Sequence, residues 1–275
     1  MKKLAAALAL SLLPLAFAAQ AEITTTDVVG RKVTVPDVPK RVVLGFYYED
    51  YLAIAGPGSL DRVVGLSLTT WKDWRPKQFA AYEKALPKLK TLPDVGSTDD
   101  NTFSIEKLIA TKPDLLILAT FSYEALGESV KQIEAAGIPV LVLDYLSQTV
   151  DKHVASTLAL GKIMGQEKRA QELADNYRKA FEDIDARIKK AGPTKKKVYF
   201  ELAQKGASEV GNSYGNSMWG ALVTRLGGHN IADGQVGNWG PLSPEYVLSQ
   251  KPDLIFLAGS EWLNKPQAVE MGFDA

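Results

Sequence analysis

The chain has no cysteine, only two histidines and no excess of either charge. Without cysteine there are no disulfides, no thiolate metal sites, no cysteine nucleophile and no cysteine that could carry a lipid near the N-terminus. The imidazoles of His153 and His229 are too few for an all-protein zinc site of the usual kinds. A net charge of zero gives no reason to expect nucleic acid or an electrostatic attachment to a membrane.

Sequence signatures of common enzymes are missing as well. Residues Gly215–Trp219 fail the G-x-S-x-G pattern of a nucleophile elbow at its last position. Residues Gly56–Asp61 lack the third glycine of a phosphate-binding G-x-G-x-x-G loop. The acidic neighbours Glu49–Asp50 and Asp99–Asp100 are more typical of solvated turns than of catalytic pairs. We therefore expect no catalytic residues and no enzyme.

The first 21 residues differ from the rest of a chain of ordinary soluble composition, 46% apolar and 23% charged. Lys2-Lys3, an apolar run over Leu4–Ala18 and Ala19-Gln20-Ala21 have the form of a cleaved signal peptide over residues 1–21. The apolar run is shorter than the ~20 residues that a membrane-spanning helix needs. The mature protein is therefore expected to be soluble and exported, in the periplasm of a two-membrane cell, without membrane insertion.

The middle of the chain carries the pattern of a long amphipathic helix over Gln166–Ala191. Its apolar residues recur at intervals of three or four, as a 3.6-residue period requires. Pairs of acid and base at Asp183–Arg187 and Asp185–Lys189 have the i,i+4 spacing that adds support. Gly192-Pro193 ends the pattern. Such a helix would be roughly 39 Å long, enough to connect two lobes.

A repeated segment lies on either side of this helix. Ser104–Ala119 and Ser243–Ala258 share a serine, a glutamate two residues later, Lys-Pro-Asp-Leu and Leu-Ala, at positions 139 residues apart. Each copy reads as a short helix, a turn and a buried strand. After Ala119 the first lobe continues for about 46 residues to Gly165, whereas only 17 follow Ala258. We expect two lobes of one design, the second apparently truncated.

Strands and helices alternate on both sides, which favours mainly parallel sheets covered by helices. The predicted helices include 52–55, 124–136, 149–165, where Gly161 and Gly165 weaken the pattern, and 217–226. Residues 207–215 and 235–240 are expected to be loops. The predicted fold class is α/β, with two Rossmann-like lobes bridged by one long α-helix. The expected organisation is a signal peptide over 1–21, an N-terminal lobe over 22–165, a bridging helix over 166–192 and a C-terminal lobe over 193–275. The expected strands cover 41–45, 62–66, 115–119, 139–143, 197–202 and 254–258.

Aromatic and polar residues follow the predicted strands. In open α/β sheets ligands bind beyond the carboxyl ends of the strands. Aromatic rings at this place suit a flat or apolar ligand with polar groups at its edge. The alternative is that several of these rings only shield the sheet ends, and we expect about half to touch ligand. The candidate ligand-binding residues are Phe46, Tyr47, Tyr48, Glu49, Thr70, Trp71, Phe121, Tyr123, Tyr214, Asn216, Trp219, Trp239 and Trp262.

Glu106 and Glu245 hold equivalent places in the two repeat copies. Each comes two residues after a serine that can cap its helix, where a carboxylate gains from the helix dipole. Capping explains one such glutamate but does not require the same residue in both lobes. A pair of surface carboxylates across a cleft could instead dock onto two basic pockets of a partner, and both roles can hold together.

Several motifs together resemble one family. The run Asp27-x-x-Gly30-Arg31-x-Val33-x-Val35-Pro36-x-x-Pro39-x-Arg41-Val42-Val43 is similar to the opening of periplasmic binding proteins for ferric siderophores, haem and cobalamin. Residues 136–140 (Ala-Gly-Ile-Pro-Val), the repeat copies and residues 226–231 (Leu-Gly-Gly-His-Asn-Ile) are similar to its later marks. The resemblance covers most of residues 24–262. It points to the helical-backbone (class III) substrate-binding proteins of ABC transporters, of ferric-siderophore type.

This resemblance implies a ligand in the cleft between the lobes and delivery to an ABC permease dimer with its ATPase. It matches Glu106 and Glu245 to the two glutamates that pair with permease arginines. A stiff bridging helix allows only modest lobe motion, and a monomer is expected. The departure is that the family's second lobe continues well beyond Ala275.

The resemblance makes a ferric siderophore or similar iron chelate the expected ligand, with no intrinsic cofactor. Tyr47, Tyr48 or Glu49 could complete the coordination of Fe(III) left open by the chelator, because hard oxygen donors suit this ion. Lys72, Arg75 and Lys205 could meet anionic groups of the chelator.

Other readings stay open at this point. Cobalamin, another metal chelate or an oxyanion are alternatives within the same transport role. Haem is disfavoured by the lack of histidine in the predicted cleft loops, although tyrosine can serve as its axial ligand. Outside transport, the alternatives are a secreted α/β enzyme and an envelope interaction protein with a degenerate cleft.

Overall fold

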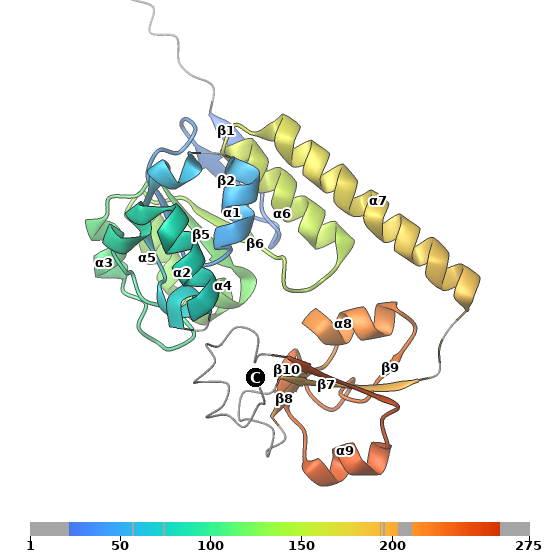
Figure 1. The fold of residues 1–275 in the computed structure, drawn as a ribbon. Helices are drawn as coiled ribbons and strands as arrows, with labels where there is room; N and C mark the ends of the chain where they lie inside the picture. Colours follow the sequence, from blue (N-terminus) through green and yellow to red (C-terminus); the bar gives the residue numbers. More distant parts are fainter. Residues whose placement is uncertain are drawn as a thin grey trace, which may run out of the picture.

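The computed structural model describes residues 22–56, 58–73, 75–192, 194, 196–202 and 211–258. Two β-sheets with surrounding helices are connected by one long helix (Figure 1). We call residues 22–163 the first lobe and residues 197–258 the second lobe. The fold is therefore the predicted α/β class with a bridging helix. The predicted signal peptide over 1–21, Lys205 and Trp262 lie outside the described residues.

The first lobe is built on a parallel four-stranded sheet. Alternate residues of its strands pack into hydrophobic clusters on opposite faces, with Leu44 and Ile117 on one face and Val43 and Leu116 on the other. Burial on both faces is what produces the nearly continuous apolar runs of these strands. The sheet order is β4-β3-β5-β6, with β3 at Val42–Leu44, β4 at Val63–Leu66, β5 at Leu115–Ala119 and β6 at Val140–Leu143.

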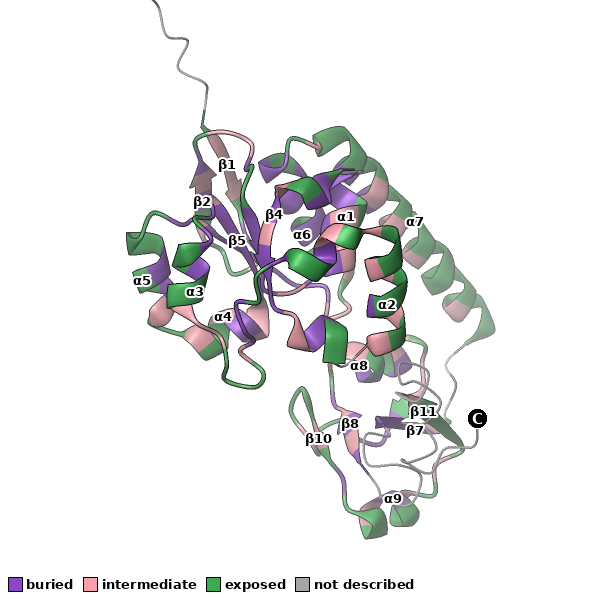
Figure 2. Cartoon of the chain, turned by 60° about the vertical axis from the view of Figure 1, so that its left-hand side comes forward, coloured by how far each residue is buried: buried purple, intermediate pink, exposed green. Residues whose placement is uncertain are grey.

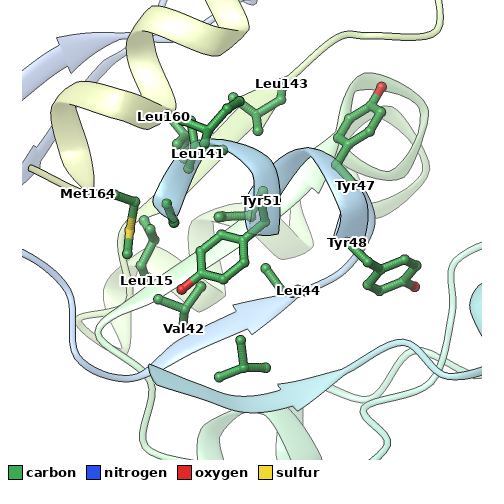
Figure 3. Close-up of a cluster of buried hydrophobic side chains, with 14 of the residues drawn as sticks. Val42, Leu44, Tyr47, Tyr48, Tyr51, Leu115, Leu141, Leu143, Leu160 and Met164 are labelled. Carbon is green, nitrogen blue, oxygen red and sulfur yellow. The ribbon is translucent and has the colours of Figure 1, made fainter. Parts of the chain in front are cut away.

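Helices cover both faces of this sheet, and a hairpin of β1 (Ile23–Thr26) and β2 (Lys32–Val35) precedes it. The core between α1, α6 and the sheet contains Tyr51, Leu115, Leu141 and Met164 (Figure 3). The helices are α1 at Tyr48–Ala55, α2 at Pro76–Ala85, α3 at Ile105–Ala110, α4 at Thr120–Leu126, α5 at Ser129–Ala135 and α6 at Val150–Ile163, with short 3-10 or π turns at Ser59–Arg62, Thr69–Asp73 and Pro87–Thr91.

Two predicted helices differ from the structure. The helix expected over 124–136 is two helices, α4 and α5, because the chain turns at Gly127 with φ 49° and ψ −123°, outside the helical region. The helix expected over Leu52–Ala55 starts earlier, at Tyr48, so that α1 carries Glu49 and Asp50 in its first turn.

The bridging helix α7 runs over Glu167–Ala191 and ends at Gly192, as predicted. Its first half packs on α6, and the outer surface of the helix is exposed over its whole length (Figure 2). The expected Asp183–Arg187 pair forms at 2.8 Å. Asp185 binds Arg225 of the second lobe, at 2.6 Å, and not the expected Lys189.

The second lobe has a mixed sheet. Its parallel part joins β7 (Lys197–Leu202) to β11 (Leu254–Ala258) and to the short β9 (His229–Asn230). Two segments expected as loops instead carry β8 (Asn212–Tyr214) and β10 (Trp239–Pro241), which extend the sheet antiparallel in the order β10-β8-β7-β11. The helices are α8 at Met218–Arg225 and α9 at Pro244–Gln250.

The Lys-Pro-Asp turn of the repeat has the same structure in both lobes. Lys112 and Lys251 both adopt a left-handed backbone conformation, with φ of 50° and 49°. The aspartate that follows accepts hydrogen bonds from main-chain N–H groups at the start of the neighbouring strand. Asp114 accepts from Arg41 at 2.8 Å, and Asp253 accepts from Lys197 at 2.7 Å. In each lobe, the Lys-Pro-Asp turn of the repeat therefore connects its own strand to the start of the neighbouring strand by hydrogen bonds.

Candidate functional site

The first wall of the candidate site is an aromatic cluster at the carboxyl ends of β3, β4 and β5. Phe46 meets Tyr47 and Phe121 edge to face, in each case with ring centroids 5.1 Å apart. Tyr48 stacks on Trp71 at 4.5 Å with nearly parallel planes. Strand-end residues that are far apart in the sequence are thus brought together, as the sequence predicts.

Tyr48, Thr70 and Trp71 form the buried support of this wall. Their exposed fractions are only 3%, 2% and 1%. The Tyr48 hydroxyl lies 2.6 Å from Thr70 Oγ1 and also donates to the Ser67 carbonyl. Burial raises the pKa of Tyr48 well above its usual range, so that its phenol stays protonated. These side chains hold the surface of the wall in place from behind.

Tyr47 has an unusual backbone. Its φ of 58° and ψ of 47° place a bulky residue in the left-handed region, directly before α1. Its hydroxyl accepts a hydrogen bond from Tyr145 N at 3.1 Å, and its ring meets that of Tyr145 edge to face at 4.9 Å. Burial also raises the pKa of Tyr47. Strained residues of this kind concentrate at functional sites. Tyr145 follows β6 at the same sheet edge, a position that would have marked it as a candidate.

Carboxylates occupy the first turn of α1. Glu49 Oε1 is buried without a hydrogen-bond partner among the described residues. Burial, with a contribution from the Glu49 charge, raises the pKa of Asp50 to about 6. A backbone hydrogen bond and, to a smaller extent, the charge of Arg75 at the start of α2 act against this rise in the pKa of Asp50. The wall thus combines aromatic rings with a pair of partly desolvated carboxyl groups and a guanidinium.

Tyr123 points away from this cluster. Phe121 and Tyr123 lie on opposite sides of α4, so that Phe121 packs with Phe46 while Tyr123 joins the cluster on the other face of the sheet. The guanidinium of Arg31 lies 4.6 Å from the centre of the Tyr123 ring. Of the two aromatic residues proposed on α4, the structure brings only Phe121 to the wall.

The second wall consists of aromatic residues around β7, β8 and α8. Phe200 stacks on Trp219 at 5.4 Å and meets Tyr214 at 5.8 Å. Trp219 is 41% and Trp239 56% exposed, unusually high values for tryptophan. Asn216 is exposed in the same region. Sequence reasoning missed Phe200, because it lies inside a strand and not after one.

One hydrogen bond and one electrostatic influence relate the walls to each other. Met218 N at the start of α8 donates a hydrogen bond to Leu146 O of the first lobe at 3.3 Å. Burial raises the pKa of Tyr214 in the second lobe, and the charge of Arg75 in the first lobe acts against this rise. A hollow of about 520 Å³ lies elsewhere, at the ends of α1 and α2 beside Arg169, and includes none of the predicted site residues.

Glu106 and Glu245 are exposed in the first turns of α3 and α9. Ser104 Oγ accepts from Lys107 N at 3.2 Å, and Ser243 Oγ accepts from Tyr246 N at 3.1 Å. The predicted caps are confirmed in both lobes. Neither glutamate takes part in an ion pair within the part of the chain that the structure describes.

Two negative findings apply to the described ranges alone. They contain no group of three or more histidine, aspartate or glutamate side chains placed to hold a metal ion. No helix among them combines the length and apolar character that crossing a bilayer requires.

The arrangement of two α/β lobes on one long helix agrees with the comparisons with known proteins. The family model for periplasmic binding proteins matches residues 43–271. The chain belongs to the periplasmic binding protein family. A periplasmic binding protein is a solute-binding protein and not an enzyme, and this one is of the class that serves ABC importers.

Solved structures and curated proteins show the same relationship. The crystal structure of the TroA-like periplasmic binding protein FepB from Veillonella parvula aligns with a TM-score of 0.77 at 31% identity, over 89% of this chain and 72% of that one. The uncharacterized ABC transporter substrate-binding lipoprotein YvrC of Bacillus subtilis is 26% identical over 85% of this chain and 68% of its own length.

Two further relatives are named after their ligands. The molybdate-binding protein MolA of Haemophilus influenzae is 26% identical over 88% of this chain and 70% of its own length. The vitamin B12-binding protein of Salmonella choleraesuis is 28% identical over 67% of this chain and 65% of its own length. This periplasmic binding protein thus spans about two thirds of the length of these curated relatives.

Proposed function

We propose that this periplasmic binding protein binds a ferric siderophore or similar iron chelate between its two lobes and delivers it to an ABC permease. One observation carries the proposal: the buried aromatic cluster around Tyr47 in the first lobe is matched by the exposed rings of Trp219 and Trp239 in the second. Large exposed rings suit an organic chelate, because they bury much apolar surface with little loss of side-chain freedom.

The polar groups fit a metal chelate in a particular way. Tyr47 and Tyr48 are buried, protonated and hydrogen-bonded, so either would have to rearrange before coordinating iron. Glu49 has a carboxylate oxygen without a partner among the described residues. We therefore propose Glu49 as the first choice for an oxygen donor to a chelated Fe(III), with Arg75 facing anionic groups of the chelator.

Other ligands in the same transport role remain candidates. An oxyanion is favoured by Arg75, whose charge acts on both walls, and by the name of the relative MolA. Cobalamin is favoured by the aromatic walls and by the vitamin B12-binding relative. Haem would need a tyrosine ligand, since His153 lies beneath Tyr145 and not on either wall.

We further propose that Glu106 and Glu245 are the contacts to the permease dimer, which works with its ATPase. Both are exposed at the start of capped helices in different lobes (Figure 2). We also propose that the signal peptide is cleaved after residue 21 and that the protein is a monomer. The proposed N-terminal lobe ends at residue 165, and the C-terminal lobe begins at residue 193.

Tryptophan fluorescence of the mature protein tests the ligand. The panel is ferric citrate, a ferric hydroxamate, a ferric catecholate, haemin, cobalamin, molybdate and uncomplexed Fe(III). We expect saturable quenching by a ferric chelate, weakened at least about tenfold by Trp219→Ala or Glu49→Gln, since both remove direct contacts. Glu172→Gln on the exposed side of α7 is the matched control.

The other outcomes of the fluorescence titration would change the proposal in different ways. Saturable quenching by cobalamin, haemin or molybdate alone would replace the siderophore with that ligand. Absence of saturable quenching throughout the panel would overturn the iron-chelate proposal and favour an interaction protein. Unchanged affinity in both variants would place the ligand away from the two walls.

A further inference from the structure

Ring contacts connect the first wall to the interior of the first lobe. Tyr47 meets Tyr145 edge to face at 4.9 Å and accepts a hydrogen bond from its N–H. Tyr145 in turn meets the imidazole of His153, on α6, edge to face at 4.7 Å. Because Tyr47 holds a left-handed backbone that a bulky residue rarely adopts, its position depends on this support.

His153 carries the series of contacts onto the bridging helix. Its ring lies flat on that of Tyr177 in α7, with centroids 3.6 Å apart and parallel planes. Tyr177 contacts Phe181, one turn further along α7, at 4.7 Å. The i,i+4 spacing keeps both rings on one face of the helix, the face that meets α6 and then α8.

Arg225, the last residue of α8, extends the series into the second lobe. Its guanidinium carbon lies 4.5 Å from the centre of the Phe181 ring. The same group binds both carboxylate oxygens of Asp185, at 2.6 and 3.1 Å. A ring below and a two-point ion pair beside it fix both the place and the orientation of the guanidinium. At the other end of α8, Met218 N binds Leu146 O of the first lobe.

We propose that His153, Tyr177 and Arg225 are positioning residues of the binding site, which set the angle between the two lobes through this unbroken series of contacts. The inference rests on the proposed function, because the angle matters to a ligand only if the ligand binds between the lobes. None of the three residues touches that ligand. Breaking a link frees the second lobe to tilt about the end of α7, as in a hinge movement.

The lack of cysteine allows a direct test. Spin labels on Lys107→Cys in α3 and Leu248→Cys in α9, both exposed positions, report the distance between the lobes by pulsed EPR. In the ligand-free protein we expect Tyr177→Leu and Arg225→Met each to widen the distance distribution, by about twofold or more. Arg187→Met, which breaks an exposed ion pair on the same helix, is the matched control and should change nothing.

Unchanged distributions in both variants would overturn the proposal. So would equal widening in Arg187→Met, because that would indicate general softening of α7. The thermal unfolding midpoint of Arg225→Met should stay within a few degrees of that of the unsubstituted protein, since a partly exposed ion pair contributes little to stability. If Arg225 only stabilised the fold, its replacement would not widen the inter-lobe distance distribution of a protein that is still fully folded. If Tyr177→Leu does not fold, Arg225→Met decides.

The measurement needs no ligand, so its result stands even if no panel member binds. If a panel member does bind, both variants should weaken its affinity by about threefold or more, because only part of the population then has the binding-competent angle. Wide distributions with undiminished affinity would show that the angle does not control binding, and would overturn the positioning role while leaving the proposed function intact.

Discussion

Asp114 and Asp253 occupy the same place in the two lobes, each joining the end of a Lys-Pro-Asp turn to the first residues of a neighbouring strand. Asp114 accepts from the N–H groups of Lys40 and Arg41, both at 2.8 Å. Asp253 accepts from Lys197 N at 2.7 Å and donates its own N–H to Lys197 O at 2.8 Å. The two copies of the sequence repeat, 139 residues apart, therefore share an aspartate because each lobe needs the same hydrogen bonds to the neighbouring strand.

Replacing these aspartates tests that requirement. We expect Asp114→Ala to lower the free energy of unfolding by about 2 kcal/mol and Asp253→Ala by about 1 kcal/mol, since hydrogen bonds to charged groups contribute most when less solvated. Urea denaturation followed by far-UV circular dichroism measures both. Asp233→Ala, at an exposed turn, is the control; an equal loss there would show that the two aspartates have no special role.

Gly161 allows α6 and α7 to pack closely. A Cβ at this position would lie 2.1 Å from Ala170 Cβ. Alanine favours a helix over glycine by about 1 kcal/mol, so propensity alone predicts that Gly161→Ala stabilises the protein. We expect the reverse, a loss of about 1–3 kcal/mol from overpacking, measured by urea denaturation.

A double substitution separates crowding from other causes. Gly161→Ala combined with Ala170→Gly moves the methyl group to the other helix and should recover part of the loss. A double variant no more stable than Gly161→Ala would contradict the close contact as the cause, and a stabilised Gly161→Ala would show that the helices can move apart without cost.

Glu106→Gln and Glu245→Gln test permease docking. Because both carboxylates are exposed and the caps are made by Ser104 and Ser243, stability should change by less than about 0.5 kcal/mol. Ligand affinity should be unchanged, while uptake into cells carrying the cognate permease should fall at least about tenfold, since a charge pair at an interface is lost.

The serine caps provide the contrasting variants. Ser104→Ala and Ser243→Ala should each lower stability by about 1 kcal/mol and leave uptake by the remaining folded protein largely intact. Normal uptake with Glu106→Gln and Glu245→Gln combined would contradict docking and leave the favourable interaction with the helix dipole as the only role of the two glutamates.

His153 should make stability depend on pH in a defined window. Burial of its ring lowers its pKa to about 4, whereas an unfolded chain has a histidine pKa of about 6.5. Well above pH 6.5 the imidazole is neutral in both states, and the residue has no effect on stability. As the pH falls from about 6.5 to about 4, the unfolded state binds a proton that the folded state does not, so stability decreases.

The size of this decrease follows from the shift. Taken in full, it would be about 3 kcal/mol; because the ring is partly exposed, we expect about 1 kcal/mol. His153→Phe keeps the ring contacts and removes the proton site, so the difference between the two proteins isolates this residue from titrating carboxylates. Parallel stability curves between pH 6.5 and 4 would contradict the burial of a neutral imidazole.

Periodicity and end signals predicted the large elements well. The strands at Leu115–Ala119 and Lys197–Leu202 have the predicted bounds, and the long helix ends at Ala191 as predicted and starts one residue later than predicted. These elements have long apolar patterns and clear breakers, so local sequence and tertiary packing agree.

The short elements of the second lobe were not predictable in the same way. Asn212–Tyr214 and Trp239–Pro241 are three-residue strands containing glycine, proline and polar residues, which have little strand propensity. They are strands because each lies beside the other and β8 pairs with the end of β7. Such pairing depends on the tertiary structure and not on the local sequence.

The candidate site shows a different limit. Strand ends predicted which residues gather at one edge of the sheet, but not which way their side chains point. Trp71 turns inward beneath Tyr48, and Tyr123 turns to the far face beside Arg31. Those directions depend on the phase of short helices such as α4, whose start was misplaced by a few residues in the prediction.

The packing of Gly161 against Ala170 has a mechanical consequence. The helix that begins at Glu167 has 25 residues and is therefore a lever about 37 Å long. A rocking of only about 5° at its anchored end would displace the far end by about 3 Å, enough to bring an aromatic ring into or out of van der Waals range. The close contact that Gly161 permits at the anchored end of α7 therefore limits how far such a rocking can move the second lobe.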